Sequence, residues 1–342
     1  MQFISSCKKD TATSPYSNNL QRKWIVTTVA GDGRALFADG PAVVASFRSP
    51  LDVAVAADGS IFVADALNHR IRKILSGRVT TVAGGDVADT TSGDASVARF
   101  IFPSELTVDS TGNLFTLDVD DPRVRKVSPS GEVAVYAGSG IRGFSDGPAA
   151  TARFGEEALG ITADASGNIF VSDYDNRRVR EISGGRQVMT IAGNGSQGMV
   201  NGTGADAEFF SLGGIVVDKQ GNLFVADWSS IRKISPSGMV STFAGSGSLG
   251  YRDGAANQAL FWNIGDMVID EQGNIYVTDN DRVRMISPNG IVSTIAGSTA
   301  GYEDGDAISA KFNGAYGLAI DKQGNIFIAD SHNNRIRELS LR

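Results

Sequence analysis

One short pattern recurs six times along this 342-residue chain, and its spacing limits what the chain can fold into. Three of the copies read "GSIFVADALNHRIRKI" from Gly59, "GNIFVSDYDNRRVREI" from Gly167 and "GNIFIADSHNNRIREL" from Gly324. The Asp that ends each "FVAD"-like run marks all six copies, at spacings of 53, 55, 54, 52 and 51 residues: Asp65, Asp118, Asp173, Asp227, Asp279 and Asp330. A regular period of this size is typical of architectures in which each repeat packs on its neighbours.

A second marker lies upstream of each copy, where an Ala-x-Phe recurs and ends at Phe47, Phe100, Phe154, Phe209, Phe261 and Phe312. Five or six residues later comes a position that lies 13 residues before the "FVAD" Asp in every repeat. The length varies only after that Asp. Loops tolerate such changes and packed strands do not, so the constant block predicts strands and the variable block predicts loops.

Each repeat contains four short runs rich in Val, Ile, Phe and Thr, which are "LDVAVA", "SIFVAD", "RIRKIL" and "RVTTVAG" in the first. Turn sequences such as Asp58-Gly59 and "SPSG" at 235–238 separate them, as in tight hairpins. Four antiparallel strands repeated six times predict an all-β fold, a six-bladed β-propeller.

The two ends of the chain complement each other. The sixth repeat stops at "IRELSLR" after its third strand, whereas "WIVTTVAG" at 24–31 is a fourth strand with no preceding three. We therefore predict that the N-terminal strand completes the last blade and closes the ring, which also removes exposed sheet edges. The propeller domain is expected to cover 22–342, after a polar tether at 1–21.

"SPLDVAVAADGSIFVADALNHRIRKI" resembles an NHL repeat, and the "AGSG...G(F/Y)xDG...AxF" segments between repeats are similar to long-form NHL propellers of bacterial extracytoplasmic proteins. The resemblance covers 22–342 and implies a six-bladed propeller. It does not imply one activity, because this fold carries many functions.

The N-terminal stretch "FISSCKKD" resembles the processing box of bacterial lipoproteins, in which the Cys is lipidated. Cys7 is the one cysteine, so neither a disulfide framework nor a Cys-cluster metal site is expected. Met1 to Ser6 is too short for a whole signal, so the true start would lie upstream. The resemblance implies an anchored protein of the bacterial cell envelope; the alternative is a free thiol on a polar terminus.

Bulk composition excludes other classes. The sequence has no run of about 18 apolar residues, so no membrane-spanning helix is predicted. The net charge of −7 at pH 7 does not suit a phosphate-binding surface, so no nucleic acid is expected. The RNA-binding mode of some NHL propellers would require a basic patch. There is no Ser-centred elbow, phosphate-binding glycine loop or Cys nucleophile in a suitable setting.

Strand order predicts two different faces. The long inter-repeat inserts and the loops after "FVAD" share one face, here called the insert face, and the compact hairpin turns share the other, the turn face. Because recognition usually resides in long variable loops on a rigid scaffold, the insert face is the expected binding face.

A residue type that recurs in every repeat is explained by the structure of the blade. A repeat that has a different residue at such a position needs another explanation. The "FVAD" Asp and the "RIR" arginines are therefore expected to be structural, bonding loop backbone or neighbouring strands. The Ala-x-Phe phenylalanines are expected to fill gaps between blades. The insert "DG" pairs are expected to be turns rather than calcium loops: Asp39-Gly40, Asp146-Gly147, Asp253-Gly254 and Asp304-Gly305.

The main departures lie at the start of the innermost strand. Blades three, four and six have Gly160, Gly214 and Gly317 there, whereas blades one, two and five have acids: Asp52, Glu105 and Asp266. Three carboxylates around one channel repel each other unless they are protonated or bound to donors or a cation. A Ca²⁺ site is one hypothesis, as in metal-dependent lactone hydrolases similar to gluconolactonase, whose residues do not transfer by motif. Bonding to channel waters or loop amides is the alternative.

Tyr174 and Trp228 follow the "FVAD" Asp in adjacent blades and are ligand-binding candidates, with packing at the blade edge as the alternative. His69 and His332 lie in "NHR"-like loops and are expected to be structural; the peptide-amidating lyases of the family need more histidines. The preferred function is thus a non-catalytic envelope scaffold that binds a peptide, glycan or protein on the insert face. A metal-dependent hydrolase or lyase using Asp52, Glu105 and Asp266 is the competing hypothesis.

Overall fold

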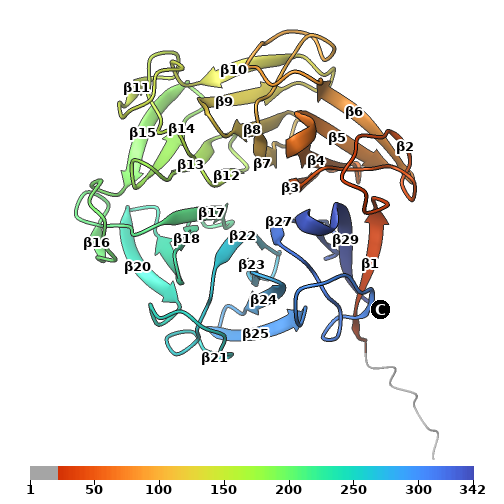
Figure 1. Ribbon diagram of the computed structural model, residues 1–342. Coiled ribbons are helices and arrows are strands. Elements are labelled where there is room, and N and C mark those ends of the chain that lie inside the picture. The colour runs from red at the N-terminus through yellow and green to blue at the C-terminus, as the bar shows by residue number, and fades with distance from the viewer. Residues whose placement is uncertain (1–21) are drawn as a thin grey trace, which may run out of the picture.

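The protein is a six-bladed β-propeller, as the repeats predict. Its structure, a computed structural model, describes residues 22–342, so Cys7 and the tether at 1–21 lie outside the described residues. Six sheets stand around a central channel like the blades of a fan (Figure 1). Among residues 22–342 no helix is long and apolar enough to cross a membrane.

Each blade takes its four main strands from one repeat, in the order predicted from the runs of β-type residues. Blade 1 contains β3 (Pro50–Val55), β4 (Ile61–Asp65), β5 (Arg70–Leu75) and β6 (Arg78–Gly84). Blade 2 contains β7 (Pro103–Val108), β8 (Leu114–Asp118), β9 (Asp121–Val127) and β10 (Val133–Ala137). Blade 3 contains β12 (Ile161–Ala163), β13 (Ile169–Asp173), β14 (Arg178–Ile182) and β15 (Gln187–Ala192).

The remaining blades follow the same plan. Blade 4 contains β17 (Leu212–Val217), β18 (Leu223–Asp227), β19 (Ser230–Ile234) and β20 (Met239–Ala244). Blade 5 contains β22 (Ile264–Ile269), β23 (Ile275–Asp279), β24 (Arg282–Ile286) and β25 (Ile291–Ala296). Blade 6 contains β27 (Ala315–Ile320), β28 (Ile326–Asp330), β29 (Arg335–Leu341) and the N-terminal β1 (Trp24–Ala30). Short 3₁₀ turns, η1 (Ala66–Asn68) and η2 (Ser331–Asn333), follow β4 and β28.

Strand β1 closes the ring as predicted. It pairs antiparallel with β29, with Ile25 opposite Ser340, so the two ends of the chain share one sheet. Two further backbone bonds join Lys23 and Arg342, at 2.7 and 2.8 Å. In Figure 1 the red N-terminal strand lies beside the blue C-terminal one.

The inserts add a fifth strand that the sequence patterns did not predict. In five blades a two-residue segment pairs with the outermost strand: β2 (Gly40–Pro41), β11 (Gly147–Pro148), β16 (Gly202–Thr203), β21 (Gly254–Ala255) and β26 (Gly305–Asp306). In blade 2 only a single bridge, Gly93 to Val133, takes its place. The inserts are therefore parts of the blades and not free loops.

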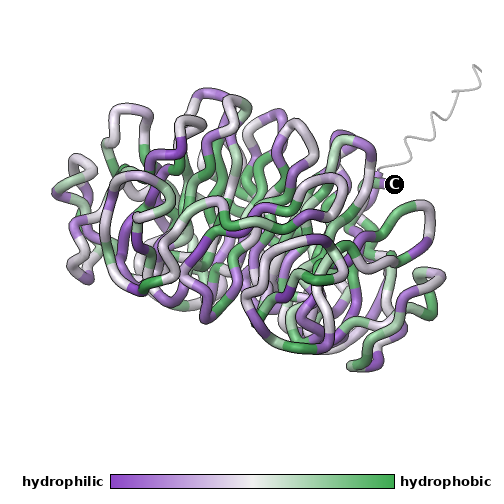
Figure 2. Tube along the Cα trace, turned by 90° about the horizontal axis from the view of Figure 1, so that it is seen from above, coloured by the Kyte–Doolittle hydropathy of each residue, from purple (hydrophilic) through white to green (hydrophobic). Residues whose placement is uncertain are grey.

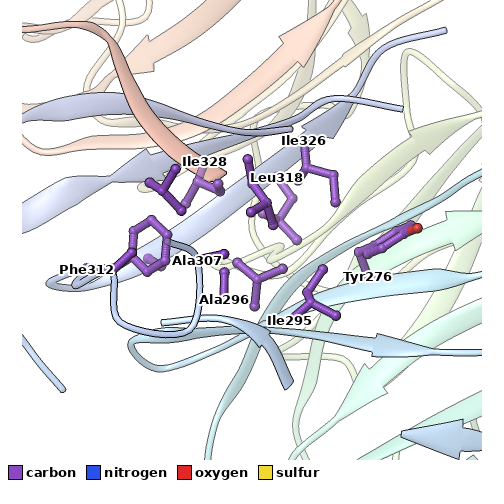
Figure 3. Packing of buried hydrophobic residues seen from close by; sticks show 13 residues of the cluster. Tyr276, Ile295, Ala296, Ala307, Phe312, Leu318, Ile326 and Ile328 are labelled. Atoms are coloured by element: carbon purple, nitrogen blue, oxygen red, sulfur yellow. The ribbon is translucent and has the colours of Figure 1, made fainter. Parts of the chain in front are cut away.

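The hydrophobic core lies between neighbouring blades rather than inside one. Phe47 of blade 1, for example, packs in a cluster with Ala319 and Ile336 of blade 6. Figure 3 shows the equivalent cluster around Phe312, where Ile295 and Tyr276 come from blade 5 and Leu318 from blade 6. Viewed from the side, hydrophobic segments run through the strands between the two faces (Figure 2). The Ala-x-Phe phenylalanines thus fill spaces between blades.

Candidate functional site

A buried ion pair stabilises five of the six blades and explains the repeated Asp and Arg residues. In blade 3, Arg180 Nη1 lies 2.8 Å from Asp173 Oδ2, and neither side chain is exposed. Asp173 also accepts the backbone N–H of Gly155 at 3.0 Å, which fixes the chain entering the innermost strand. The equivalent pairs are Arg72–Asp65, Arg232–Asp227, Arg284–Asp279 and Arg337–Asp330.

The same arginine joins the insert to the blade. Arg180 Nη2 contacts Asp146 Oδ1 of the insert "DG" pair at 2.7 Å, and its guanidinium carbon lies 5.1 Å from the centre of the Phe154 ring. Asp39, Asp253 and Asp304 bond their arginines in the same way. The insert acids are therefore arginine partners, a role that the sequence patterns did not indicate because the partners lie more than 30 residues apart.

Blade 2 is the exception. Its arginine, Arg125, lies 3.5 Å from Asp121 instead of pairing with Asp118. Within the described residues Arg125 Nε and Asp121 Oδ2 make no hydrogen bond. Burial raises the pKa of Asp118 to about 7, and the Asp121 charge adds to the rise, although the backbone N–H groups of Phe102 and Ile101 oppose it.

The three predicted channel acids lie together at one end of the central channel. Asp52 of β3, Glu105 of β7 and Asp266 of β22 line the same cavity, and the lining continues from them along these strands toward the turn face. The cavity holds about 320 Å³. Asp52 is only 2% exposed, and Glu105 and Asp266 are half-buried, so the three side chains lie within the channel end.

Two of these carboxylates bond the backbone of the next blade. The Leu106 N–H donates to Asp52 Oδ2 at 2.6 Å, and the Leu318 N–H donates to Asp266 Oδ2 at 2.8 Å. Asp52 Oδ1 accepts the N–H of Val53 at 2.7 Å. Asp52 and Asp266 thus link adjacent innermost strands, and the amides they accept belong to strands rather than to loops.

The glycines at the equivalent positions make room for the acids. A side-chain carbon added at Gly317 would lie 2.1 Å from Asp52 Oδ1, and one at Gly214 would lie 2.8 Å from Asp266 Oδ1. Each of these acids therefore has a glycine on the preceding blade. This packing explains Gly214 and Gly317, whereas Gly160 has Gly214 and not an acid beside it.

Electrostatics at the channel end favours protonated acids. Burial raises the pKa of Asp52 well above its usual range, and the Asp266 charge raises it further. Burial also raises the pKa of Glu105, with added repulsion from Asp52 and Asp266, and raises the pKa of Asp266 to about 7. Burial, with repulsion between the acids as the smaller cause, thus favours the protonated forms in this cluster.

Asp52 is a poor calcium ligand in this arrangement. Among residues 22–342 no group of three or more His, Cys, Asp or Glu side chains is arranged to hold a metal ion. Both oxygens of Asp52 already accept backbone N–H groups. In this arrangement the Asp52 carboxylate is an acceptor for the backbone rather than a ligand with free oxygens for a cation.

The ligand candidates Trp228 and Tyr174 lie in the predicted loops after β18 and β13. Trp228 is 36% exposed and adopts a left-handed backbone with φ of 58°. Its ring packs on Phe210, with centroids 4.9 Å apart. Tyr174 is half-buried at the start of a turn closed by the Arg177 N–H, and no ring of the described residues stacks on it.

Two further exposed aromatic residues were missed at the sequence level. Trp262 of blade 5 is 50% exposed and Tyr316 of blade 6 is 40% exposed. Trp262 occupies the blade position of Phe210, directly after the Ala-x-Phe, whereas blades 1 and 3 have Arg48 and Gly155 there. Comparing the repeats at this position would have revealed Trp262, and comparing the residue directly before the innermost Gly or acid would have revealed Tyr316.

A pocket of about 270 Å³ opens on the insert face between blades 5 and 6. Its lining residues are Asn263, Gly265, Asn280, Asp281, Asn313, Gly314, Ala315, Tyr316 and His332. It forms where the loop after β23 is shorter than the loop after β28, and where glycine replaces bulkier residues at position 265. Asn280 Nδ2 bonds the Tyr251 hydroxyl at 3.0 Å, and the Tyr251 ring stacks on Trp262.

Tyr251 itself has a structural role. Its ring covers the guanidinium of Arg282 at 4.0 Å, as Phe37, Phe144 and Tyr302 cover the equivalent arginines of blades 1, 3 and 6. The two histidines differ in their surroundings. His69 Nδ1 bonds the Ile101 carbonyl at 2.5 Å, whereas His332 packs edge-on against Tyr316 and lines the pocket.

Known proteins share this architecture. The NHL repeat family matches residues 47–74 and 312–339, in blades 1 and 6. A solved protein of unknown function from Bacteroides thetaiotaomicron superposes with a TM-score of 0.73 at 21% identity, over 94% of this chain and 76% of that one. An auxiliary nutrient binding protein from the same organism gives 0.70 at 17% identity, over 94% and 77%.

Among curated proteins, Teneurin-3 of Danio rerio is 27% identical over 285 residues, which is 73% of this chain. The chain spans only about a tenth of the length of such teneurin relatives. At these identities the solved structures support the fold alone. The chain is thus a six-bladed β-propeller in which two of the repeats match the NHL repeat family.

Proposed function

We propose that this propeller is a non-catalytic binding scaffold that captures a glycan on the insert face of blades 4 to 6. One observation carries the proposal. Four exposed aromatic side chains gather on three consecutive blades without serving the repeated blade structure: Phe210, Trp228, Trp262 and Tyr316. The equivalent positions of blade 1 hold Arg48, Ala66 and Leu51.

Large exposed apolar patches mark interaction sites, whereas single exposed rings need no such explanation. Rings of Trp and Tyr offer broad flat surfaces at low entropic cost, and the apolar faces of sugar rings stack on such surfaces. The aromatic side chains therefore supply the stacking part of a glycan site.

The pocket between blades 5 and 6 supplies the polar part. Its amides, on Asn263, Asn280 and Asn313, can each donate and accept hydrogen bonds. The Asp281 carboxylate accepts the Gly314 N–H at 3.1 Å through Oδ1, and its second oxygen can accept from a hydroxyl group. A few polar groups beside aromatic walls are the usual composition of small-molecule sites.

The names of related proteins fit a binding role. Two structural neighbours from Bacteroides species are described as auxiliary nutrient binding proteins. We place the protein at the bacterial envelope, anchored through Cys7, because "FISSCKKD" resembles a lipoprotein processing box. A peptide or protein ligand on the same face is the alternative outcome of a binding screen.

The test is a glycan-array screen of residues 22–342, followed by calorimetry with the best ligand. Trp262→Ala and Trp228→Ala should each weaken binding at least about tenfold, since buried aromatic anchors dominate binding energies. Phe144→Ala is the matched control, because this exposed insert ring of blade 3 covers Arg178 and lies outside blades 4 to 6. Unchanged binding in both Trp variants, or a face that binds peptides and no glycan, would refute the proposal.

A further inference from the structure

A second cavity lies on the turn face, in the groove between blades 1 and 2. It has a volume of about 500 Å³, larger than that of the central channel. Phe62, Lys73 and Val82 of blade 1 line one side, and Leu114 and Ser128 of blade 2 line the other. The ammonium of Lys73 lies 5.5 Å from the centre of the Phe62 ring, so a cation stands over an aromatic floor.

A lysine near a phenylalanine ring also occurs at the equivalent positions of blades 2 and 4. In those two blades a second aromatic ring packs against the phenylalanine. In blade 2, Lys126 lies 6.0 Å from the Phe115 ring, and Tyr136 packs edge-on against that ring at 4.8 Å. In blade 4, Lys233 lies 5.6 Å from the Phe224 ring, and Phe243 packs at 4.9 Å.

Blade 1 has the Phe and the Lys but lacks the second ring. The position of Tyr136 and Phe243 is held by Val82, which is the residue directly before the Ala-Gly that ends the strand in each repeat. A valine in place of an aromatic ring leaves the space that the cavity occupies. Edge-to-face packing of two rings contributes about 0.5–1.5 kcal/mol beyond burial, so a ring placed here would be stabilised.

We propose that this groove binds the aryl ring of a small uncharged phenol-like ligand, which takes the place that the Tyr136 ring has in the next blade. The ring would pack edge-on against Phe62, next to the Lys73 ammonium and against Leu114. Hydroxyl groups of Thr80, Thr111 and Ser128 line the cavity and provide partners for a phenolic hydroxyl.

The charges around the groove favour a neutral ligand. Lys73 Nζ lies 3.9 Å from Asp58 Oδ2, so its charge already has a partner. The Asp109 carboxylate accepts donors from Thr111 and Asn113 within its own turn. Since one ammonium faces two carboxylates, an aryl carboxylate would find no net positive charge here, and an uncharged aryl ring suits the site better.

The test is a titration of residues 22–342 with p-cresol, followed by the methyl resonances of Val82 and Leu114 in NMR spectra. We expect saturable shifts, because a bound ring lies over these methyl groups. Cyclohexanol, which has a ring of similar size without π electrons, should bind at least about fivefold more weakly, because it lacks the aromatic contacts with Phe62 and Lys73.

Val82→Tyr is the decisive variant. It builds into blade 1 the ring that blade 2 has at Tyr136, so it should abolish the p-cresol shifts while leaving the thermal midpoint unchanged or raised. Lys73→Met, at a half-buried side chain, should weaken p-cresol several-fold and gives an independent test if Val82→Tyr does not fold.

Trp262→Ala separates this site from the proposed glycan site, because it lies on the insert face and should leave the p-cresol shifts intact. The proposal is overturned if the wild-type protein shows no saturable shifts, if Val82→Tyr keeps them, or if Trp262→Ala removes them. None of these outcomes bears on glycan binding by the insert face.

Discussion

Blades 2 and 3 are neighbours with loops of the same length between the "FVAD"-type Asp and the arginine, yet only blade 3 pairs these two residues. Between the "FVAD"-type Asp and the arginine, blade 3 reads "DYDNRRVR" and blade 2 reads "DVDDPRVR". Asn176 of blade 3 donates to both oxygens of Asp173 at 3.0 and 2.9 Å and to the Gly143 carbonyl. The equivalent residue of blade 2 is Asp121, which has no N–H to donate.

One changed side chain therefore redirects the whole cluster. Asp121 attracts the guanidinium groups of Arg123 and Arg125, and Asp118 keeps only backbone donors. Asp and Asn side chains have the same shape, but an Asp at this position replaces a neutral donor with a like charge. The comparison teaches that in the longer loops of blades 1, 3 and 6 a third residue, a neutral Asn, supports the repeated ion pair. The shorter loops of blades 4 and 5 form the pair without such a residue.

Removing the arginine should have the largest effect on the free energy of unfolding, and the loss should differ between blades 3 and 2. Arg180→Met leaves Asp173 and Asp146 without their cation, and removing one partner of a buried pair costs about 3–5 kcal/mol. Arg125→Met should cost roughly half as much, because this arginine has a weaker contact at 3.5 Å. Urea unfolding of both variants measures the difference; equal losses would contradict the comparison.

Exchanging the third residue between the blades should have the next largest effect. Asn176→Asp places a like charge beside Asp173 and should lower the free energy of unfolding by about 2–3 kcal/mol at pH 8. Asp121→Asn should raise it by about 1–2 kcal/mol, because it removes a like charge and supplies a donor. Two changes of the same sign would refute the assigned role of this position.

The pH dependence of Asp121→Asn gives a second readout. In the folded wild type the pKa of Asp118 is about 7, above the ordinary 3.8, so the folded protein binds this proton more tightly than the unfolded chain. Its contribution to stability is full below about pH 4 and is lost as the pH rises to about 7. Asp121→Asn should reduce this loss, because the Asp121 charge raises that pKa.

Urea unfolding of the wild type and of Asp121→Asn at pH 5 and pH 8 measures how much Asp121 contributes to this loss of stability. The channel acids titrate in the same range, but they are common to wild type and variant and cancel in the difference. A variant that loses as much stability as the wild type between these pH values would show that Asp121 does not control Asp118.

Introducing into blade 2 the insert acid that other blades have should have the smallest effect on the free energy of unfolding. Ser92 of blade 2 occupies the place of the "DG" acids, with its Oγ 3.4 Å from Arg125 Nη2. Ser92→Asp should stabilise the protein by about 1 kcal/mol, in the range of a charge-assisted bond at a part-exposed site. Asn201→Asp of blade 4 is the control and should gain less, since Asn201 already accepts from Arg232 at 2.9 Å. A larger gain at 201 than at 92 would contradict this ranking.

The sequence by itself determined the architecture. Hairpin turns and runs of β-type residues are local signals, and their sixfold repetition located every main strand, the closure by the N-terminal strand and the two faces. Phe47 and its equivalents could be assigned to gaps between blades for the same reason, because they recur at a fixed place in each unit.

Only the tertiary structure decided which residues meet. Arg180 and Asp146 are 34 residues apart, and Gly317 faces Asp52 across the joint where the ring closes. The channel acids looked like a metal site in the sequence, but in the structure Asp52 and Asp266 bond the backbone of adjacent strands. Likewise, the pocket beside Tyr316 and the open space beside Phe62 lie between blades, so they depend on side-chain volumes from two repeats at once.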